Sequence, residues 1–504
     1  MVATTAVTAA LILVAGCGGN DKKSESGSEN KGGESTTSAT PSTPTVPSFD
    51  PPKVFSPTAA YPAIEEKGRS TLDESQMGIA GQVALVGSWA GLKGYDVADP
   101  KNTWTVKSAE AETTDVYDAA KPMAAKVDGK DVAVVAYAES DKGQGTQKPA
   151  GLVVIQWIDV MTGKKIAEVS QKVSTVEGSD SSSLGAPSIK AQAYDPETGQ
   201  VAIGATTTGN LTVGATVQTV YADPKTQKAT VVPGISPAAV HGGVVAGAKA
   251  ESKENADDAG VLIVDGASGK VTKQVPLKQG VLTPLGGGAK HGYFYGSKYT
   301  NYGQGTKAEA IFTVDLTTGA AAQTVTTIPM ESDSTIECVP DQATTVVCTN
   351  KTIRQGAREL IGFDDETGKK TWGFSDKSGG RVVPQVTAAF HGVIYAQTDA
   401  QPVLLDAKSG EDLPSGSSSP SSSDSPSSSD SPSSSDTPSS SDTPSESSGN
   451  ESPGNGDMGL FNGKVRSPQA VSPYGGVYRQ LPTGEDYGAT VQVESICIYL
   501  KPSA

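Results

Sequence analysis

Histidine and cysteine are the residue types of this chain best suited to metal binding or nucleophilic chemistry, and both are scarce. The 504 residues include three histidines and four cysteines. Each histidine precedes a glycine and a short apolar run, at His241, His291 and His391. A metal site needs side chains that converge on one point. Because the same local context recurs at separations of 50 and 100 residues, we expect each histidine to pack in the same turn of a different repeat.

Two of the cysteines are spaced for a disulfide across a hairpin. Cys338 and Cys348 bracket a Pro-Asp turn between two runs of β-type sequence. An oxidising, exported setting favours pairing of cysteines that face each other on neighbouring strands. The sequence therefore predicts a Cys338–Cys348 disulfide. Cys497 lies between two isoleucines, which favours a buried, unreactive thiol over a reactive one.

The fourth cysteine, Cys17, ends an N-terminal apolar segment. Residues 1–16 carry no charge, and their apolar run from Ala6 to Ala15 has the length of a signal-peptide core, too short to span a bilayer. The sequence Val-Ala-Gly-Cys17-Gly resembles the lipobox of bacterial lipoproteins. This resemblance implies that Cys17 is lipid-modified and becomes the first residue of the mature chain. Two acyl chains are enough for stable membrane anchoring.

The sequence holds no other familiar chemical motif, and its charge balance excludes one class of partner. It contains no CxxCH, G-x-S-x-G, HExxH or P-loop. The 56 acidic and 40 basic side chains give a net charge of -16, so no basic surplus is available to neutralise nucleic-acid phosphates. We therefore expect no catalytic, cofactor-binding or metal-binding residues, no cofactor and no nucleic-acid partner, and predict that the chain is not an enzyme.

The segments that carry these residues repeat between Ile79 and Leu413. A strand-like run is followed by Asp-x-x-(Thr/Ser)-Gly and a second strand-like run. In such a turn, aspartate accepts a hydrogen bond from the backbone two residues on, and glycine takes a positive φ. From Asp223 the aspartates recur at steps of 42 to 50 residues, the period of a four-stranded propeller blade. The copies begin at Asp159, Asp195, Asp265, Asp315, Asp364 and Asp406, with Asp223 as a variant.

Short strands, dense turn signals and a fixed period predict an all-β propeller of four-stranded blades. Eight blades are favoured, and seven remain an alternative.

The repeat resembles the pyrroloquinoline-quinone-like (PQQ-like) β-propeller repeat over about 350 residues. Residues 362–372 match the blade signature Ala-x-Asp-x-x-Thr-Gly-Lys-x-x-Trp, except for glycine at the first position. That family includes quinoprotein dehydrogenases, assembly-factor lipoproteins and many actinobacterial lipoproteins. The resemblance therefore implies the fold and leaves the chemistry open. We expect Trp104, Trp157 and Trp372 to pack between neighbouring sheets.

The remaining segments define the expected organisation of the chain. A signal peptide (1–16) and a flexible stalk (17–48) precede the propeller (49–413), and residues 459–504 supply its closing strands. Between them, 414–458 form a Ser/Pro/Asp-rich tract with almost no apolar side chains, which is predicted to be a disordered insertion. Because the chain ends of a propeller commonly meet in one blade, residues 49–55 are candidates for a strand that pairs with the C-terminal one.

Together these features predict a monomeric lipoprotein of actinobacterial type, anchored to the extracytoplasmic face of the cell membrane. Its propeller is expected to be a non-catalytic module that binds or scaffolds an unidentified protein or cell-envelope partner. One alternative is a quinoprotein dehydrogenase, which needs a cation-binding funnel at the centre of the ring. Another is a surface sensor or envelope assembly factor, which a contiguous exposed apolar patch would favour.

Overall fold

All the residues described below in the computed structural model belong to one unit of the chain, within Pro44–Ala504. The described residues are 47–65, 76–99, 101–108, 114–141, 150–173, 187–207, 216–250, 252, 256–298, 307–328, 334–352, 356–414, 466–480 and 496–503. Within these ranges no helix is long and apolar enough to cross a membrane.

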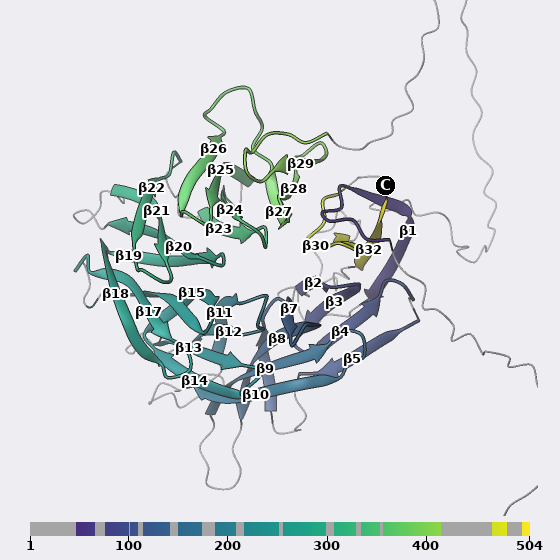
Figure 1. Ribbon diagram of the computed structural model, residues 1–504, viewed down its shortest axis with the longest axis horizontal. Helices are drawn as coiled ribbons and strands as arrows, with labels where there is room; N and C mark the ends of the chain where they lie inside the picture. The colour runs from purple at the N-terminus through teal and green to yellow at the C-terminus, as the bar shows by residue number, and fades with distance from the viewer. Residues whose placement is uncertain are drawn as a thin grey trace, which may run out of the picture. The chain divides into compact units, whose positions relative to one another are not determined.

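All the described elements are β-strands, and they form eight antiparallel sheets. Figure 1 shows these sheets arranged around a common centre. The innermost strand of each sheet contacts the innermost strand of the next, and β30 contacts β2 to complete the circle. The fold is an eight-bladed β-propeller, as the sequence predicted.

The first four blades follow one another along the chain. Blade 1 contains β2 (Gln76–Ala80), β3 (Val83–Ser88), β4 (Gly91–Asp96) and β5 (Thr103–Lys107). Blade 2 contains β6 (Thr114–Ala119), β7 (Met123–Val127), β8 (Lys130–Asp141), β9 (Ala150–Asp159) and β10 (Lys165–Val173). Blade 3 contains β11 (Pro187–Tyr194), β12 (Val201–Thr207), β13 (Thr216–Asp223) and β14 (Lys228–Pro233). Blade 4 contains β15 (Ile235–His241), β16 (Val244–Lys249), β17 (Ala259–Asp265) and β18 (Lys270–Gln279).

The last four blades complete the ring. Blade 5 contains β19 (Val281–Gly287), β20 (His291–Lys298), β21 (Lys307–Asp315) and β22 (Ala321–Val325). Blade 6 contains β23 (Ser334–Pro340), β24 (Thr345–Thr352), β25 (Gly356–Asp364) and β26 (Lys369–Ser375). Blade 7 contains β27 (Gln385–Phe390), β28 (Val393–Gln397) and β29 (Pro402–Asp406). Blade 8 contains β30 (Ala470–Ser472), β31 (Gly475–Gln480), β32 (Ile496–Ser503) and β1 (Val54–Glu65).

The Asp-x-x-(Thr/Ser)-Gly phrase forms the hairpin that the sequence predicted. In the best copy, Asp364 Oδ1 accepts hydrogen bonds from the Thr367 backbone N–H at 2.8 Å and from its hydroxyl at 3.0 Å, and Gly368 has a φ of 67°. Most copies join the third strand of a blade to the outer segment that follows it. The copy at Asp195 instead joins the first and second strands of blade 3, where the variant at Asp223 fills the usual place.

Two blades depart from the four-strand pattern. In blade 2 the inner strand is interrupted between Ala119 and Met123, so that β6 and β7 pair with successive parts of β8. Pro122 lies in this interruption, and proline cannot donate a hydrogen bond to a strand ladder. Blade 7 has three strands among the described residues, and its outer edge is extended only by the bridge between Leu405 and Asp412.

The hydrophobic core is divided into eight clusters, one between each pair of neighbouring blades. Between blades 2 and 3, for example, Trp157 packs with Ile155 and Ile203, all completely buried. Met77 and Ile79 of blade 1 pack with Val477 and Tyr499 of blade 8. Burial of apolar area therefore holds every blade to both of its neighbours, and the ring is closed by the same force at each junction.

The two ends of the described chain meet in blade 8. Strand β1 pairs antiparallel with β32, and the pairs include Val54 with Ser503 and Phe55 with Pro502. This confirms the expected pairing of the N-terminal strand with the C-terminal one, although β1 extends to Glu65. Cys17 and the predicted insertion at 414–458 lie outside the described residues, except for Pro414. The side chain of Cys497 is likewise outside them.

Candidate functional site

The candidate site is the cavity on the propeller axis, which has a volume of about 620 Å³. Every blade contributes inner-strand residues to its wall, and the lining includes the amide side chains of Gln76, Gln192, Gln385 and Gln469. Several inner strands carry a β-bulge, as at Lys190, Ala238, Leu285 and Thr387, where the register with the second strand shifts by one residue. Bulges of this kind bend the inner strands and redirect side chains.

One end of this channel is lined by basic groups. Lys121, Lys351 and Arg479 line the cavity together with a single carboxylate, Glu337. Lys121 lies two residues before β7. Lys351 and Arg479 lie on second strands, near the start of their inner strands. These four residues, called the basic end below, come from blades 2, 6 and 8. A channel in a chain of net charge -16 therefore has a cationic end.

Contacts within the basic end hold its charges in place. The Lys351 ammonium donates a hydrogen bond to Glu337 Oε2 at 3.0 Å. Lys121 is exposed to solvent, but the atoms packed around its amine partly desolvate it and lower its pKa below the ordinary lysine value. Glu337 opposes the lowering and Arg479 adds to it. Charges on blades 2, 6 and 8 are thus close enough to act on one another.

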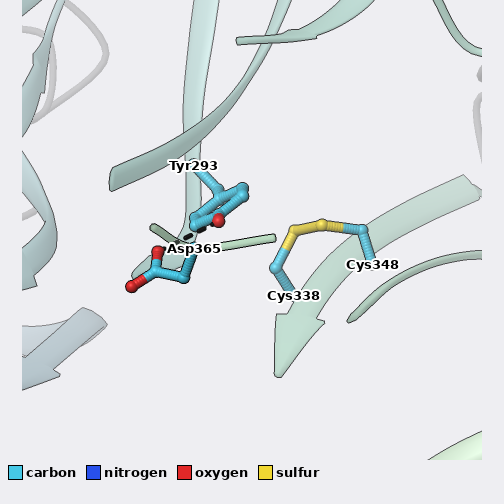
Figure 2. Close-up of a disulfide and its surroundings, with 4 residues drawn as sticks. All are labelled: Tyr293, Cys338, Cys348 and Asp365. Carbon is cyan, nitrogen blue, oxygen red and sulfur yellow. Dashed lines mark hydrogen bonds between the residues drawn. A yellow bond between two sulfur atoms is a disulfide. The ribbon is translucent and has the colours of Figure 1, made fainter. Parts of the chain in front are cut away.

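The other end of the channel is lined by acidic residues that are occupied by structural hydrogen bonds. Asp195 Oδ2 accepts the Gly242 backbone N–H at 3.0 Å, and Asp341 Oδ2 accepts that of Gly392 at 3.0 Å. Each of these bonds joins two neighbouring blades. Asp365 Oδ1 accepts the Tyr293 hydroxyl at 3.0 Å, also between blades, as Figure 2 shows. These carboxylates therefore hold the turns of neighbouring blades together by hydrogen bonds.

The predicted disulfide is present. Cys338 on β23 and Cys348 on β24 lie directly opposite each other in the strand register and are bonded, as Figure 2 shows. Both cysteines are buried in the cluster between blades 5 and 6. The disulfide therefore joins the first and second strands of blade 6, and Cys338 lines the cavity next to Glu337.

The histidines occupy the turn between the first and second strands of three blades, as predicted. His241 Nδ1 lies 3.5 Å from Asp195, His291 Nδ1 contacts the Asp365 backbone oxygen at 2.6 Å, and His391 contacts Asp50. All three contacts reach a neighbouring blade or the N-terminal segment. In the described part of the chain, no group of three or more His, Cys, Asp or Glu side chains is placed to hold a metal.

The tryptophans pack between blades, which confirms their predicted role. The indole N–H of Trp104 donates to the Val160 oxygen at 2.7 Å, that of Trp157 to the Gly199 oxygen at 2.7 Å, and that of Trp372 to the Ala407 oxygen at 2.8 Å. None of the three lines the axial cavity. Among the described residues of that lining, Tyr194 is the one phenol or indole side chain, and the imidazole of His241 lines the cavity as well.

Sequence reasoning missed the four residues of the basic end. They share no motif, and Lys121 and Arg479 are far apart along the chain. One signal was available. When the repeats are aligned on their inner strands, Lys121 and Glu337 fall in or beside segments where other blades place glutamine or small side chains.

Comparisons with known proteins find solved structures of low similarity only. No protein-family model and no curated protein matches the sequence. Matching solved structures include the β-propeller domain of the trilobed protease from Pyrococcus furiosus, with 12% identity and a TM-score of 0.33, covering 61% of this chain and 84% of that one. Dihydro-heme d1 dehydrogenase NirN matches with 12% identity and a TM-score of 0.36, covering 67% and 66%. Pyrococcus horikoshii acylaminoacyl peptidase matches with 13% identity and a TM-score of 0.31, covering 59% and 45%.

These comparisons contradict the prediction that the chain is not an enzyme. The matching structures include peptidases and a dehydrogenase, so the exclusion of catalysis was wrong. It relied on the absence of contiguous motifs, whereas a propeller can bring reactive groups together from separate blades. At these levels of identity the comparisons identify neither a reaction nor a ligand for this chain.

Proposed function

We propose that this chain is an extracytoplasmic lipoprotein of the PQQ-like repeat type, anchored through Cys17, whose propeller binds a small ligand in its axial channel. The observation that carries the binding proposal is the cavity of about 620 Å³. Small-molecule sites in proteins generally have volumes of about 300–1,000 Å³, with a few polar groups that orient the ligand.

The wall of the channel has the features of such a site. Its backbone is fixed by inner strands from all eight blades, and rigid elements hold binding groups more accurately than loops do. Glutamine amides supply donors and acceptors, and buried residues such as Met77 and Met123 supply apolar surface. A ligand on the axis would therefore meet both kinds of contact on several blades at once.

Photo-crosslinking inside cells tests the binding proposal. A diazirine amino acid at Gln385, an exposed residue of the channel wall, should form an adduct with a small molecule that mass spectrometry can weigh. The matched control is the same amino acid at Val382, which is 73% exposed and outside the channel lining. A small-molecule adduct at Gln385 and none at Val382 is expected. No adduct, or the same adduct at both positions, contradicts binding in the channel.

The anchor is tested separately by Cys17→Ser. The apolar run that ends at Cys17 supports lipid modification at this residue. We expect the variant to leave the membrane fraction and appear in the soluble fraction, because the acyl chains provide the hydrophobic attachment. Fractionation with a high-salt wash is the measurement. Retention of the variant in washed membranes would show that another element attaches the chain.

A further inference from the structure

The axial channel has opposite charge character at its two ends. Among the described residues of the basic end, Lys121, Lys351 and Arg479 line the cavity with one carboxylate, Glu337. At the opposite end the lining includes Asp195, Glu197, Asp341 and Asp365 with a single histidine, His241. The cations come from blades 2, 6 and 8, so they approach the axis from different sides. A ligand that enters this space experiences an electrostatic gradient along the axis.

We infer that the basic end binds an anionic group, a carboxylate or a phosphate, of the small ligand proposed above. This inference rests on the proposed function, since it names the class of ligand that the channel takes. Two long amines and a guanidinium can donate charge-assisted hydrogen bonds to such a group. Arginine in particular forms paired hydrogen bonds with planar carboxylates and with phosphates.

The surroundings of Lys121 favour the binding of an anion. Desolvation beside the channel wall lowers the pKa of Lys121 the most, and the charges of Glu337 and Arg479 have smaller effects. A partly desolvated ammonium gains more from an added anion than a fully hydrated ammonium does. Glu337 is already hydrogen-bonded to Lys351 at 3.0 Å. Lys121 therefore shares the negative charge of Glu337 with Lys351.

The acidic end favours the same orientation. Asp195, Asp341 and Asp365 accept backbone or hydroxyl hydrogen bonds from neighbouring blades. Their positions are therefore fixed, and their negative charge repels an anion placed beside them. The anionic group of the ligand should lie among Lys121, Lys351 and Arg479, and its uncharged or cationic part should extend toward the turns.

Calorimetric titration of the full mature chain carrying Cys17→Ser tests the inference. The probes are citrate and pyrophosphate, with glucose and spermine as neutral and cationic comparisons. Vesicles of phosphatidylglycerol form a separate arm, which distinguishes a lipid headgroup from a free anion. We expect citrate or pyrophosphate to bind in a salt-sensitive way, and glucose, spermine and the vesicles to bind at least tenfold more weakly.

Matched double variants locate the binding. Lys121→Gln with Arg479→Gln should weaken anion binding at least tenfold. Lys228→Gln with Lys270→Gln removes the same formal charge from exposed positions on outer strands and should leave the affinity unchanged. Circular dichroism and melting temperature confirm that both variants are folded. Equal loss in both variants, or anion affinity no greater than that of glucose, overturns the inference.

The crosslinking experiment separates this inference from the function on which it rests. An adduct at Gln385 whose molecule carries no acidic group leaves binding in the channel intact and overturns the anion assignment. No adduct at Gln385 contradicts the binding function itself. An acidic adduct that is lost in the Lys121→Gln and Arg479→Gln variant supports both.

Discussion

Glu139 is a buried carboxyl group in β8, with only 3% of its surface exposed. Burial raises its pKa to about 7, and the nearby charge of Glu168 adds to the effect. Its Oε1 atom has no hydrogen-bond partner within the described residues, and neither has the hydroxyl of Tyr137. Loss of hydration without compensating hydrogen bonds favours the neutral form of a carboxyl. Glu139 therefore makes the stability of the fold depend on pH.

The raised pKa predicts that acid stabilises this part of the protein. The contribution of protonated Glu139 to the free energy of unfolding is fully present below its unfolded pKa, near 4.5. This contribution is lost as the pH rises through its folded pKa of about 7. Glu139→Gln should remove this dependence, so that the variant is more stable than the parent at pH 8 by about 1 to 3 kcal/mol and no more stable at pH 4.5. Urea unfolding at the two pH values measures this.

The control is Glu366→Gln, at a carboxylate whose side chain is 68% exposed. It should leave the pH dependence of the parent protein unchanged. A Glu139→Gln variant with the same pH dependence as the parent would show that Glu139 ionises normally in the folded state.

Different side chains make the same kind of contact between blades. Trp104 and Trp372 donate an indole N–H to a turn of the next blade. Between blades 3 and 4 the hydroxyl of Thr230 donates to the Ala267 oxygen at 2.8 Å, and between blades 4 and 5 Lys273 contacts the Thr317 oxygen. A blade can therefore lack the tryptophan of the repeat signature when another side chain, such as Thr230 or Lys273, donates a hydrogen bond to the corresponding turn of the next blade.

Gly410 provides a test of the tryptophan contact. A Cβ on Gly410 would lie 2.5 Å from the Trp372 ring, whereas a Cβ on Gly379 would meet nothing within 4 Å. Their φ angles, 69° and 66°, are nearly equal. Gly379→Ala should cost about 1 to 2 kcal/mol from the positive φ alone, and Gly410→Ala a further 1 to 3 kcal/mol, approximately, from overpacking. Chemical denaturation measures both. Equal losses would mean that Trp372 moves aside without cost.

The whole ring depends on a strand from the far end of the chain. Strand β1 is the outermost strand of blade 8, and it pairs with β32 over its length. The segment before it also contacts both of the last blades. The Phe49 backbone N–H donates to the Pro473 oxygen at 2.7 Å, and the Tyr395 hydroxyl donates to the Pro52 oxygen at 2.6 Å. The N-terminal segment therefore fastens blade 8 to blade 7.

Truncation tests this closure. A chain that begins at Pro47 keeps β1 and should melt at the temperature of the mature protein. A chain that begins at Gln76 lacks β1, so β32 becomes an open edge and the contacts to Pro473 and Tyr395 are lost. We expect a melting temperature at least several degrees lower and a tendency to aggregate, because unpaired edge strands associate. Calorimetry and light scattering measure these effects. Equal melting of the two truncated chains would show that closure does not need β1.

The sequence by itself determined the features that depend on neighbouring residues. The Asp-x-x-(Thr/Ser)-Gly turns are local, since Asp364 bonds to Thr367 within the same hairpin, and their period was sufficient to predict a propeller and favour eight blades. Cys338 and Cys348 flank a single turn, so their pairing followed from spacing. The packing of Trp372 could be inferred from the repeat because each blade presents the same face to the next.

Only the tertiary structure decided which residues line the axis together. Lys121, Glu337 and Arg479 are far apart in the sequence, and they approach one another because the ring brings blades 2, 6 and 8 around one channel. Periodicity describes how each blade is built but says nothing about which side chains face each other across the axis. Pairing of the N-terminal strand with the C-terminal one was expected from the sequence, but only the structure shows that β1 extends to Glu65. The propeller fold can therefore be predicted from the repeated turn motif in the sequence. The charged channel depends on contacts across the ring, which no local sequence pattern specifies.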